Sequence, residues 1–218
     1  MWESFGFEFI NFYFIPGLVL GCIYALGAIG ITLTFGILRF ANFSHGEIMM
    51  TSSYLTWEAM VISASLGLIV HPLIGAIPAC LCAILLALLV DRFFYKPFRN
   101  SPTIIIVIAS FGMMLIIRSM VQVVWGPNQL TFVKGIAKPN PYIKDLTASF
   151  DLMLLIPNKH FLILIGTIII MLIFNYILSS TKIGKGMRAV SDNPDLAKVS
   201  GIDVESIIRA TWIVGGFC

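Results

Sequence analysis

A short polar sequence lies between two long apolar stretches near the N-terminal end of the chain. Residues 39–47 read Arg-Phe-Ala-Asn-Phe-Ser-His-Gly-Glu, and apolar runs over about residues 9–38 and 48–70 flank them. Polar and ionisable groups at membrane depth are costly, so they tend to face protein or a water-filled path and to mark function. The candidates for lining a solute route are Asn42, Ser44, His45 and Glu47.

Two of these residues also have a structural interpretation. Ser44 and Glu47 have the S-x-x-E spacing of a capping box, in which each side chain bonds the other's backbone N–H at the start of a helix. A helix N-terminus buried in a bundle also presents free N–H groups and a positive dipole end, which bind anionic solute groups in many transporters. Asn42 and His45 are not needed for the cap, and His45 alone could be an interfacial histidine with its hydrogen bonds satisfied. The residues leave capping and solute contact both open.

The composition of the chain indicates a membrane protein. Of its 218 residues, 58% are hydrophobic and only 11% are charged, whereas a soluble domain carries about 25% charged residues. The apolar runs are continuous and about 20 residues long, the length of a spanning helix, and do not show the ~10-residue alternation of a membrane barrel. The predicted fold class is therefore all-α, a polytopic helical membrane protein. Its basic residues lie in loops between helices, which fits membrane orientation better than nucleic-acid binding.

We expect five full transmembrane helices and the start of a sixth. The full spans cover about residues 14–38, 46–66, 73–94, 103–124 and 161–178. A sixth opens near Ile207 and stops at Cys218, which leaves about twelve residues, too few to cross. We therefore expect residues 1–218 to form a single transmembrane domain that is truncated at its C-terminal end.

Two features inside the spans predict contacts between helices. Small residues in the first span fall four apart at Gly17, Gly21 and Ala25, a spacing that lets another helix approach closely. Glu58 and Arg118 are expected at similar depth in spans two and four, which enter from the same face. Unpaired, each charge would be costly in the membrane, so the two side chains are a candidate intramembrane pair. The alternative is that Glu58 faces the solute path and contacts an ammonium group.

The basic residues predict how the chain is oriented. Two loops are rich in Lys and Arg: one follows span three with Arg92, Lys96 and Arg99, and one follows span five with Lys182, Lys185, Arg188 and Lys198. The positive-inside rule places both in the cytoplasm. Counting back puts the N-terminus outside and the 39–47 break near the inner face. Residues 125–160 are then external, although they hold four lysines.

The cytoplasmic loop of about residues 180–206 is expected to contain a short helix of about two turns. Asn193 suits the N-cap, Pro194 the first helical position, Asp195 the first turn and Gly201 the C′ position. An apolar face for packing on a partner or on the bundle would be formed by Leu196, Val199 and Ile202. An ordinary ordered loop is the alternative.

With these motifs in place, the chain resembles the permease subunits of ABC importers for branched-chain amino acids, the LivH type, and their relatives for urea and amides. The resemblance rests on GLVLGCIYAL at 17–26, NFSHGE at 42–47, GMRA at 186–189, and the Asn-Pro and Gly-Ile pairs that bound 193–202. These motifs keep the family's order and rough spacing, and the resemblance covers essentially the whole chain. The family normally continues past this C-terminus with further spans.

The resemblance implies a role for the cytoplasmic helix and a set of partners. The helix would be the coupling helix that docks on an ATPase, through Asn193, Pro194, Asp195, Ala197, Gly201 and Ile202. The partners would be a second permease subunit, two cytoplasmic ATPase subunits that hold ATP and Mg²⁺, and a periplasmic solute-binding protein, at the bacterial inner membrane. The solute would be a branched-chain or other small amino acid, with urea and short amides as alternatives.

Other function classes fit less of the sequence. An intramembrane enzyme could use His45 and Glu47 as an acid–base or metal pair, but His71 and His160 fall in or beside the predicted external loops and no H-E-x-x-H occurs. The four cysteines lie in apolar runs, so neither a metal site nor a disulfide framework is expected. The sequence has no G-x-x-x-x-G-K-[ST] phosphate loop. A secondary transporter or channel would leave the capped helix without a purpose. We expect a transporter subunit that is not an enzyme and holds no cofactor.

Overall fold

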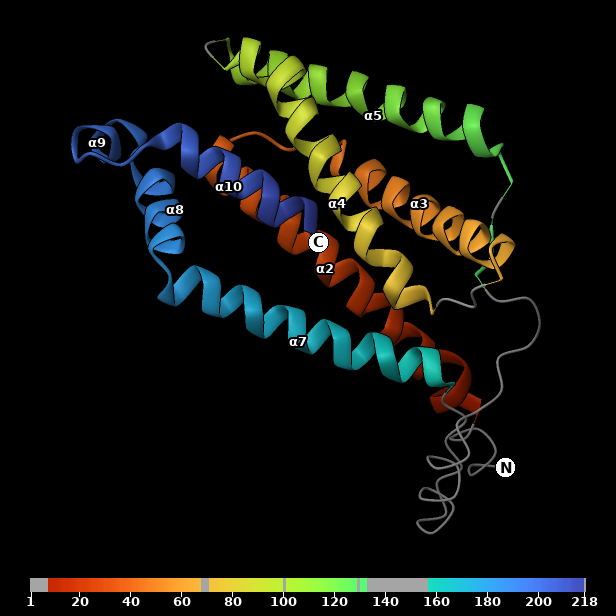
Figure 1. Ribbon diagram of the computed structural model, residues 1–218. Helices are drawn as coiled ribbons and strands as arrows, with labels where there is room; N and C mark the ends of the chain where they lie inside the picture. Colours follow the sequence, from red (N-terminus) through yellow and green to blue (C-terminus); the bar gives the residue numbers. More distant parts are fainter. Residues whose placement is uncertain (1–7, 68–70, 100, 129, 133–156, 218) are drawn as a thin grey trace. The chain divides into compact units, whose positions relative to one another are not determined.

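A computed structural model describes residues 8–67, 71–99, 101–128, 130–132 and 157–217, and these are almost entirely helical (Figure 1). In chain order the elements are η1 (Phe9–Phe14), α2 (Ile15–Leu38), α3 (His45–Ser65), α4 (Pro72–Val90), η2 (Asp91–Tyr95), η3 (Lys96–Phe98), α5 (Thr103–Trp125), α7 (Asn158–Ser180), α8 (Lys182–Asp192), α9 (Pro194–Val199) and α10 (Val204–Phe217). Elements η1 and η2 are π-helical, and η3 is a 3₁₀ turn. The all-α class predicted from the sequence is confirmed.

Four helical stretches among the described residues are long and apolar enough to cross a membrane. They are Phe9–Leu38, Pro72–Phe98, Thr103–Trp125 and Lys159–Ser180. The predicted count of five full spans therefore needs correction at α3. This helix has 21 residues, but Glu47, Glu58 and several Ser and Thr side chains make it less apolar than the other four.

The chain forms two compact units, residues 1–26 with 134–176 and residues 27–133 with 177–218. In the first unit, Gly17 and Gly21 are exposed, and a Cβ on either would meet no atom within 4 Å. Ala25 is half-buried. The close packing predicted at the two glycines is therefore not made by the described residues, and packing of this face on another chain stays a prediction.

The core of the second unit forms where α10 packs between α4 and α8. Trp212 of α10 is buried in this core together with Tyr95. Gly216 allows α10 to approach α4 closely, because a Cβ there would lie 3.1 Å from the Cα of Ile84. The core side chains from α4, α8 and α10 include Ala83, Ala87, Val90, Met187, Val190, Ile207 and Ile208.

Gly30 of α2 faces the first residue of α3. A Cβ on Gly30 would clash with the imidazole ring of His45 and would lie 3.4 Å from the backbone oxygen of Gly215 in α10. The His45 side chain is only 3% exposed, so the ring cannot move aside without disturbing its neighbours. Gly30 therefore sets how closely α2, α3 and α10 can meet.

We expect Gly30→Ala to lower the melting temperature of the purified protein in detergent, because overpacking a core typically costs ~1–3 kcal/mol. Gly17→Ala is the matched control: it adds the same methyl to the same helix but meets no atom within 4 Å. Adding His45→Ala to Gly30→Ala should recover much of the loss. An unchanged melting temperature for Gly30→Ala would contradict the close contact.

Candidate functional site

The polar segment between α2 and α3 is buried inside the second unit. Asn42 is 1% exposed and Ser44 is fully buried. The Oδ1 atom of Asn42 lies 2.8 Å from the Ser44 hydroxyl and 2.9 Å from the Tyr95 hydroxyl, and the two hydroxyls are 2.8 Å apart. Oδ1 also accepts a hydrogen bond from the Ser44 backbone N–H at 3.2 Å. The three side chains form a closed triangle, which we call the break triangle.

Tyr95 was not among the residues predicted from the sequence. It ends η2, the π-helical turn that continues α4. Its ring stacks on Trp212 with 5.5 Å between centroids and meets Phe40 edge-on at 5.1 Å. Because π-helical turns have no reliable local sequence signature and follow from tertiary packing, the pattern DRFFY gave no signal for this contact.

The predicted capping box at the start of α3 is not formed. Ser44 is the N-cap residue, but its side chain makes no capping hydrogen bond. Its hydroxyl is engaged in the break triangle instead. Glu47 has its Oε1 atom 3.9 Å from Nη1 of Arg118. The start of α3 therefore lacks the side-chain cap that the S-x-x-E spacing predicts.

Three polar side-chain atoms at the break are buried without a hydrogen-bond partner among the described residues: Nδ2 of Asn42, Nε2 of His45 and Oε2 of Glu47. The amide nitrogen is a donor, the carboxylate oxygen an acceptor, and the imidazole nitrogen can be either. An unsatisfied buried polar group costs about 1–3 kcal/mol. Three of them within six residues are therefore a candidate binding surface for a polar solute or water.

The break lies well inside the bundle relative to the start of α5. Ser110 donates a hydrogen bond to the backbone oxygen of Ala41 at 3.2 Å, and the ring centroids of Phe43 and Phe111 are 4.3 Å apart. Ser110 lies seven positions after Thr103, the first residue of α5, or ~10 Å at ~1.5 Å per residue. Helix α3 therefore begins about two turns further along the bundle than α5.

This offset corrects the predicted pairing of Glu58 with Arg118. The prediction placed the two at equal depth by assuming that α3 and α5 start level. With α3 displaced, Arg118 lies beside Glu47, and the Oε2 atom of Glu58 accepts a hydrogen bond from the indole N–H of Trp125 at 3.0 Å. Each of the two charged residues thus has a different partner from the one expected.

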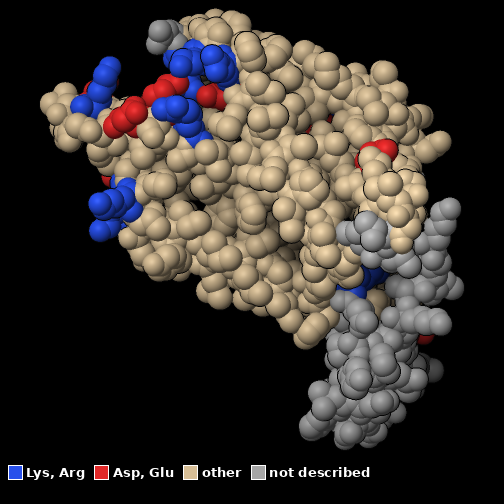
Figure 2. All heavy atoms as spheres, viewed as in Figure 1, with Lys and Arg blue, Asp and Glu red and all other residues tan. Residues whose placement is uncertain are grey.

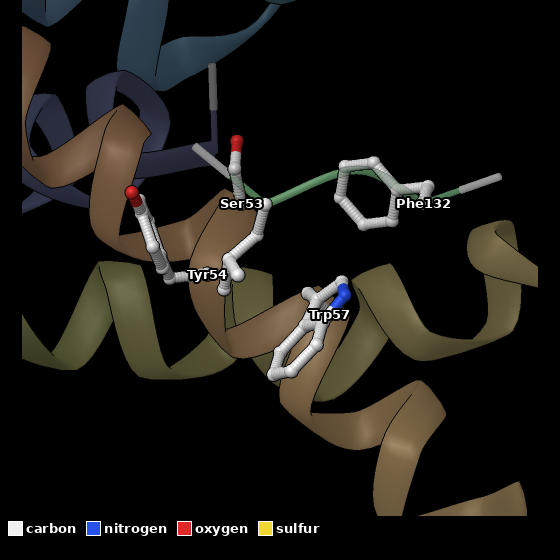
Figure 3. A pocket seen from close by; sticks show the side chains of 5 residues that line it. Ser53, Tyr54, Trp57 and Phe132 are labelled. Carbon is white, nitrogen blue, oxygen red and sulfur yellow. The ribbon is translucent and has the colours of Figure 1, made fainter. Parts of the chain in front are cut away.

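An aromatic cavity of about 200 Å³ opens beside α3. It is lined by Ser53, Tyr54, Trp57, Leu130 and Phe132, and Figure 3 shows the rings of Tyr54, Trp57 and Phe132 around it. The Tyr54 ring lies 5.5 Å from Trp125, the residue that holds Glu58. Since aromatic faces attract cations, this cavity suits an ammonium group.

The loop of about residues 180–206 folds as two helices, of which the sequence predicted only α9. Asn193 caps α9 as expected, because its Oδ1 atom accepts from the backbone N–H groups of Asp195 and Leu196, both at 3.0 Å. Pro194 is the first residue of α9. Gly201, with φ of +83°, is in the left-handed conformation expected after a helix end. The short capped helix is therefore confirmed.

The apolar face predicted for α9 is only partly free. Leu196 is 64% exposed and Val199 is 86% exposed, whereas Ile202 packs against the core. Ala197 is buried. The preceding helix α8 was missed, although Thr181 caps it by accepting from the N–H of Gly184 at 3.1 Å.

An ion-pair network joins the end of the α4 segment to the start of α10. Glu205 of α10 lies 2.6 Å from Nζ of Lys96 and 2.7 Å from Nη1 of Arg99, and Arg99 also binds Asp91 at 2.7 Å. The hydrogen bond from Lys96 is the main reason that the pKa of Glu205 lies below its ordinary value. These residues, which we call the Glu205 network, follow α9 closely along the chain.

A multi-pass helical membrane protein with a buried polar break and a capped helix outside its spans has the features of a membrane permease. Residues 13–218 match the family model described as "Branched-chain amino acid transport system / permease component". The chain belongs to this family.

Curated relatives agree with the family match. The chain is 28% identical to the high-affinity branched-chain amino acid transport system permease protein LivH of Salmonella typhimurium and 27% identical to LivH of Escherichia coli K12, in each case over 91% of this chain and 64% of the relative. It is 28% identical to BraD of Pseudomonas aeruginosa, over 92% of this chain and 65% of the relative. The chain thus spans slightly under two thirds of the length of these relatives. No solved structure matches.

We expect Tyr95→Phe to lower the melting temperature in detergent, because it removes one hydroxyl from the break triangle while keeping the ring stack on Trp212. A buried hydrogen bond contributes about 1 kcal/mol, and more when its loss leaves a partner unsatisfied. Tyr176→Phe is the matched control, since that side chain is 65% exposed. Equal melting temperatures for both variants would argue against the triangle as a stabilising element.

We expect the protein to lose stability in acid through the Glu205 network. Because the folded-state pKa of Glu205 is lowered from 4.5, its contribution is complete above that value and is lost as the pH falls through the lowered pKa. Melting temperatures between pH 7 and pH 3 should therefore fall less steeply for Glu205→Gln than for the unmodified protein. Asp195→Asn, which changes an exposed acid of α9, should leave the slope unchanged; a similar flattening by both variants would refute the assignment.

Proposed function

We propose that this chain forms part of the translocation path of an ABC importer that takes up branched-chain or other small amino acids. The observation that carries the proposal is the set of unpartnered polar atoms on Asn42, His45 and Glu47 in a break about two turns inside the bundle. The family match and the names of the relatives support the solute class.

The chemistry of the break suits a zwitterionic solute. The amide nitrogen of Asn42 can donate to a carboxylate, as can His45, while the carboxylate of Glu47 can accept from an ammonium group. The positive dipole end of α3 adds to the attraction for a carboxylate. A solute that passed the break would exchange hydrogen bonds with water for hydrogen bonds with these groups, which lowers the cost of leaving water.

The proposal includes partners and a location. A second permease subunit, two ATPase subunits that hold ATP and Mg²⁺, and a periplasmic solute-binding protein would complete the importer at the bacterial inner membrane, with the N-terminus outside. The sequence contains no phosphate loop, so the energy would come from the ATPase subunits. The free face at Gly17 and Gly21 is suited to close contact with the second permease subunit.

Helix α9 has the properties that docking on an ATPase requires. It is held at both ends by Asn193 and Gly201, and it exposes Leu196 and Val199 to solvent. A hollow of about 260 Å³ beside it, lined partly by Leu196, Ser200 and Ile202, offers a place for a partner's side chain. Because Ile202 packs in the core and α10 starts at Val204, a push on α9 would reach α10 directly.

We expect Glu47→Gln to reduce uptake of radiolabelled leucine by the complete importer about 10–100-fold, because a hydrogen bond to a charged group contributes about 1.5–3 kcal/mol. Glu58→Gln is the comparison: it removes an acid from the same helix that already has Trp125 as its partner. Full uptake by a normally expressed Glu47→Gln variant would overturn the path assignment. Loss of uptake only in Glu58→Gln would move the ammonium contact to the aromatic cavity.

We expect Leu196→Asp or Val199→Asp to reduce ATP-driven uptake while membrane insertion and melting temperature stay unchanged, because both side chains are exposed in the isolated chain. The measurement is transport and ATP hydrolysis by the reconstituted importer. Ile183→Asp in α8, where the side chain is 47% exposed, is the matched control. Normal uptake in both α9 variants would remove the docking assignment; Ala197→Asp is unsuitable because Ala197 is buried.

A further inference from the structure

A charged hollow of about 620 Å³ lies between the end of the α4 segment and the first turns of α10. Its lining residues are Leu88, Asp91, Arg92, Lys96, Glu205 and Arg209. In Figure 2 the basic and acidic side chains gather at the upper left, over the ends of these elements, while most of the remaining visible surface carries neither charge. The transport path proposed above does not use this hollow.

The hollow carries positive charge that its own acids do not neutralise. Asp91 and Glu205 are both engaged in the Glu205 network, where Lys96 and Arg99 balance them. Arg92 and Arg209 line the same hollow, are exposed, and form no ion pair within the described ranges of the chain. Two guanidinium groups are therefore left over, and their planar forks of N–H donors match the oxygens of a phosphate group.

The surroundings of Arg92 place the hollow at the edge of an apolar span. Arg92 lies near the end of the Pro72–Phe98 stretch, which is apolar enough to cross a membrane. The next two residues, Phe93 and Phe94, are 65% and 40% exposed, and Leu89 is 43% exposed. Exposed aromatic and aliphatic side chains beside spare cations are what the boundary between acyl chains and head groups favours.

We propose that this hollow binds the phosphate head group of an anionic membrane phospholipid. Arg92 and Arg209 hold the phosphate from the α4 segment and from α10, and the acyl chains lie along Leu89, Phe93 and Phe94. A lipid seated there bridges two elements that are otherwise joined by the Glu205 network, directly after α9. Lipid composition would therefore affect how firmly the start of α10 is held.

The test is lipid retention by the purified chain in a neutral detergent, measured by native mass spectrometry with dioleoyl-phosphatidylglycerol or dioleoyl-phosphatidylcholine. We expect the anionic lipid to bind and the zwitterionic lipid to bind at least about fivefold more weakly. The double variant Arg92→Gln with Arg209→Gln should lose this preference. Lys182→Gln with Lys185→Gln, which removes two exposed charges from α8 outside the hollow, should retain it.

Two further arms identify the ligand and protect against misfolding. Arg92→Lys with Arg209→Lys keeps the charge but removes the bidentate forks, so it should retain the fold and bind the anionic lipid less tightly than the unmodified chain. Equal losses in the hollow variant and the α8 variant would show general charge attraction and overturn the proposal. Displacement of the lipid by millimolar inorganic phosphate, which itself bound only when Arg92 and Arg209 were present, would assign the hollow to a free anion and also overturn it.

Discussion

A helix that stops inside a bundle leaves backbone groups that water cannot easily reach, and the second unit is organised around this demand. Asn42 and Ser44 meet part of it within the break itself. Tyr95 supplies the remaining hydroxyl and brings the end of the α4 segment with it, and its ring stack on Trp212 brings α10. One small hydrogen-bonded group thus joins elements that are far apart in the sequence.

The helices could be predicted from the sequence because their signals are local. Long apolar runs gave the spans to within a few residues, and Asn193, Pro194 and Gly201 gave both ends of α9. Helix α8 was missed because Gly184 and Gly186 are poor helix formers. Both glycines are buried against other parts of the chain, where a larger side chain would not fit, so tertiary packing decides this helix.

The candidate site could be predicted only in part. Residue type alone marked Asn42, Ser44, His45 and Glu47, because polar groups in an apolar run are informative wherever they end up. Gly30 and Tyr95 could not be found this way, since each matters through one contact with a residue distant in sequence. The partners of Glu58 and Arg118 depend on where α3 starts relative to α5, and apolar periodicity carries no information about that offset when every face is apolar.

The π-helical turn η2 makes one short segment sensitive to chain length in a way that substitutions would not reveal. A π turn holds more residues than an α turn, so deletion of one residue between Asp91 and Tyr95 would let the segment relax to an α-helix. Everything after it would then rotate by about 100°. Tyr95 would leave Asn42, and Lys96 would leave Glu205. Among natural variants, insertions and deletions should therefore be purged here even where changes of side chain at the exposed positions survive.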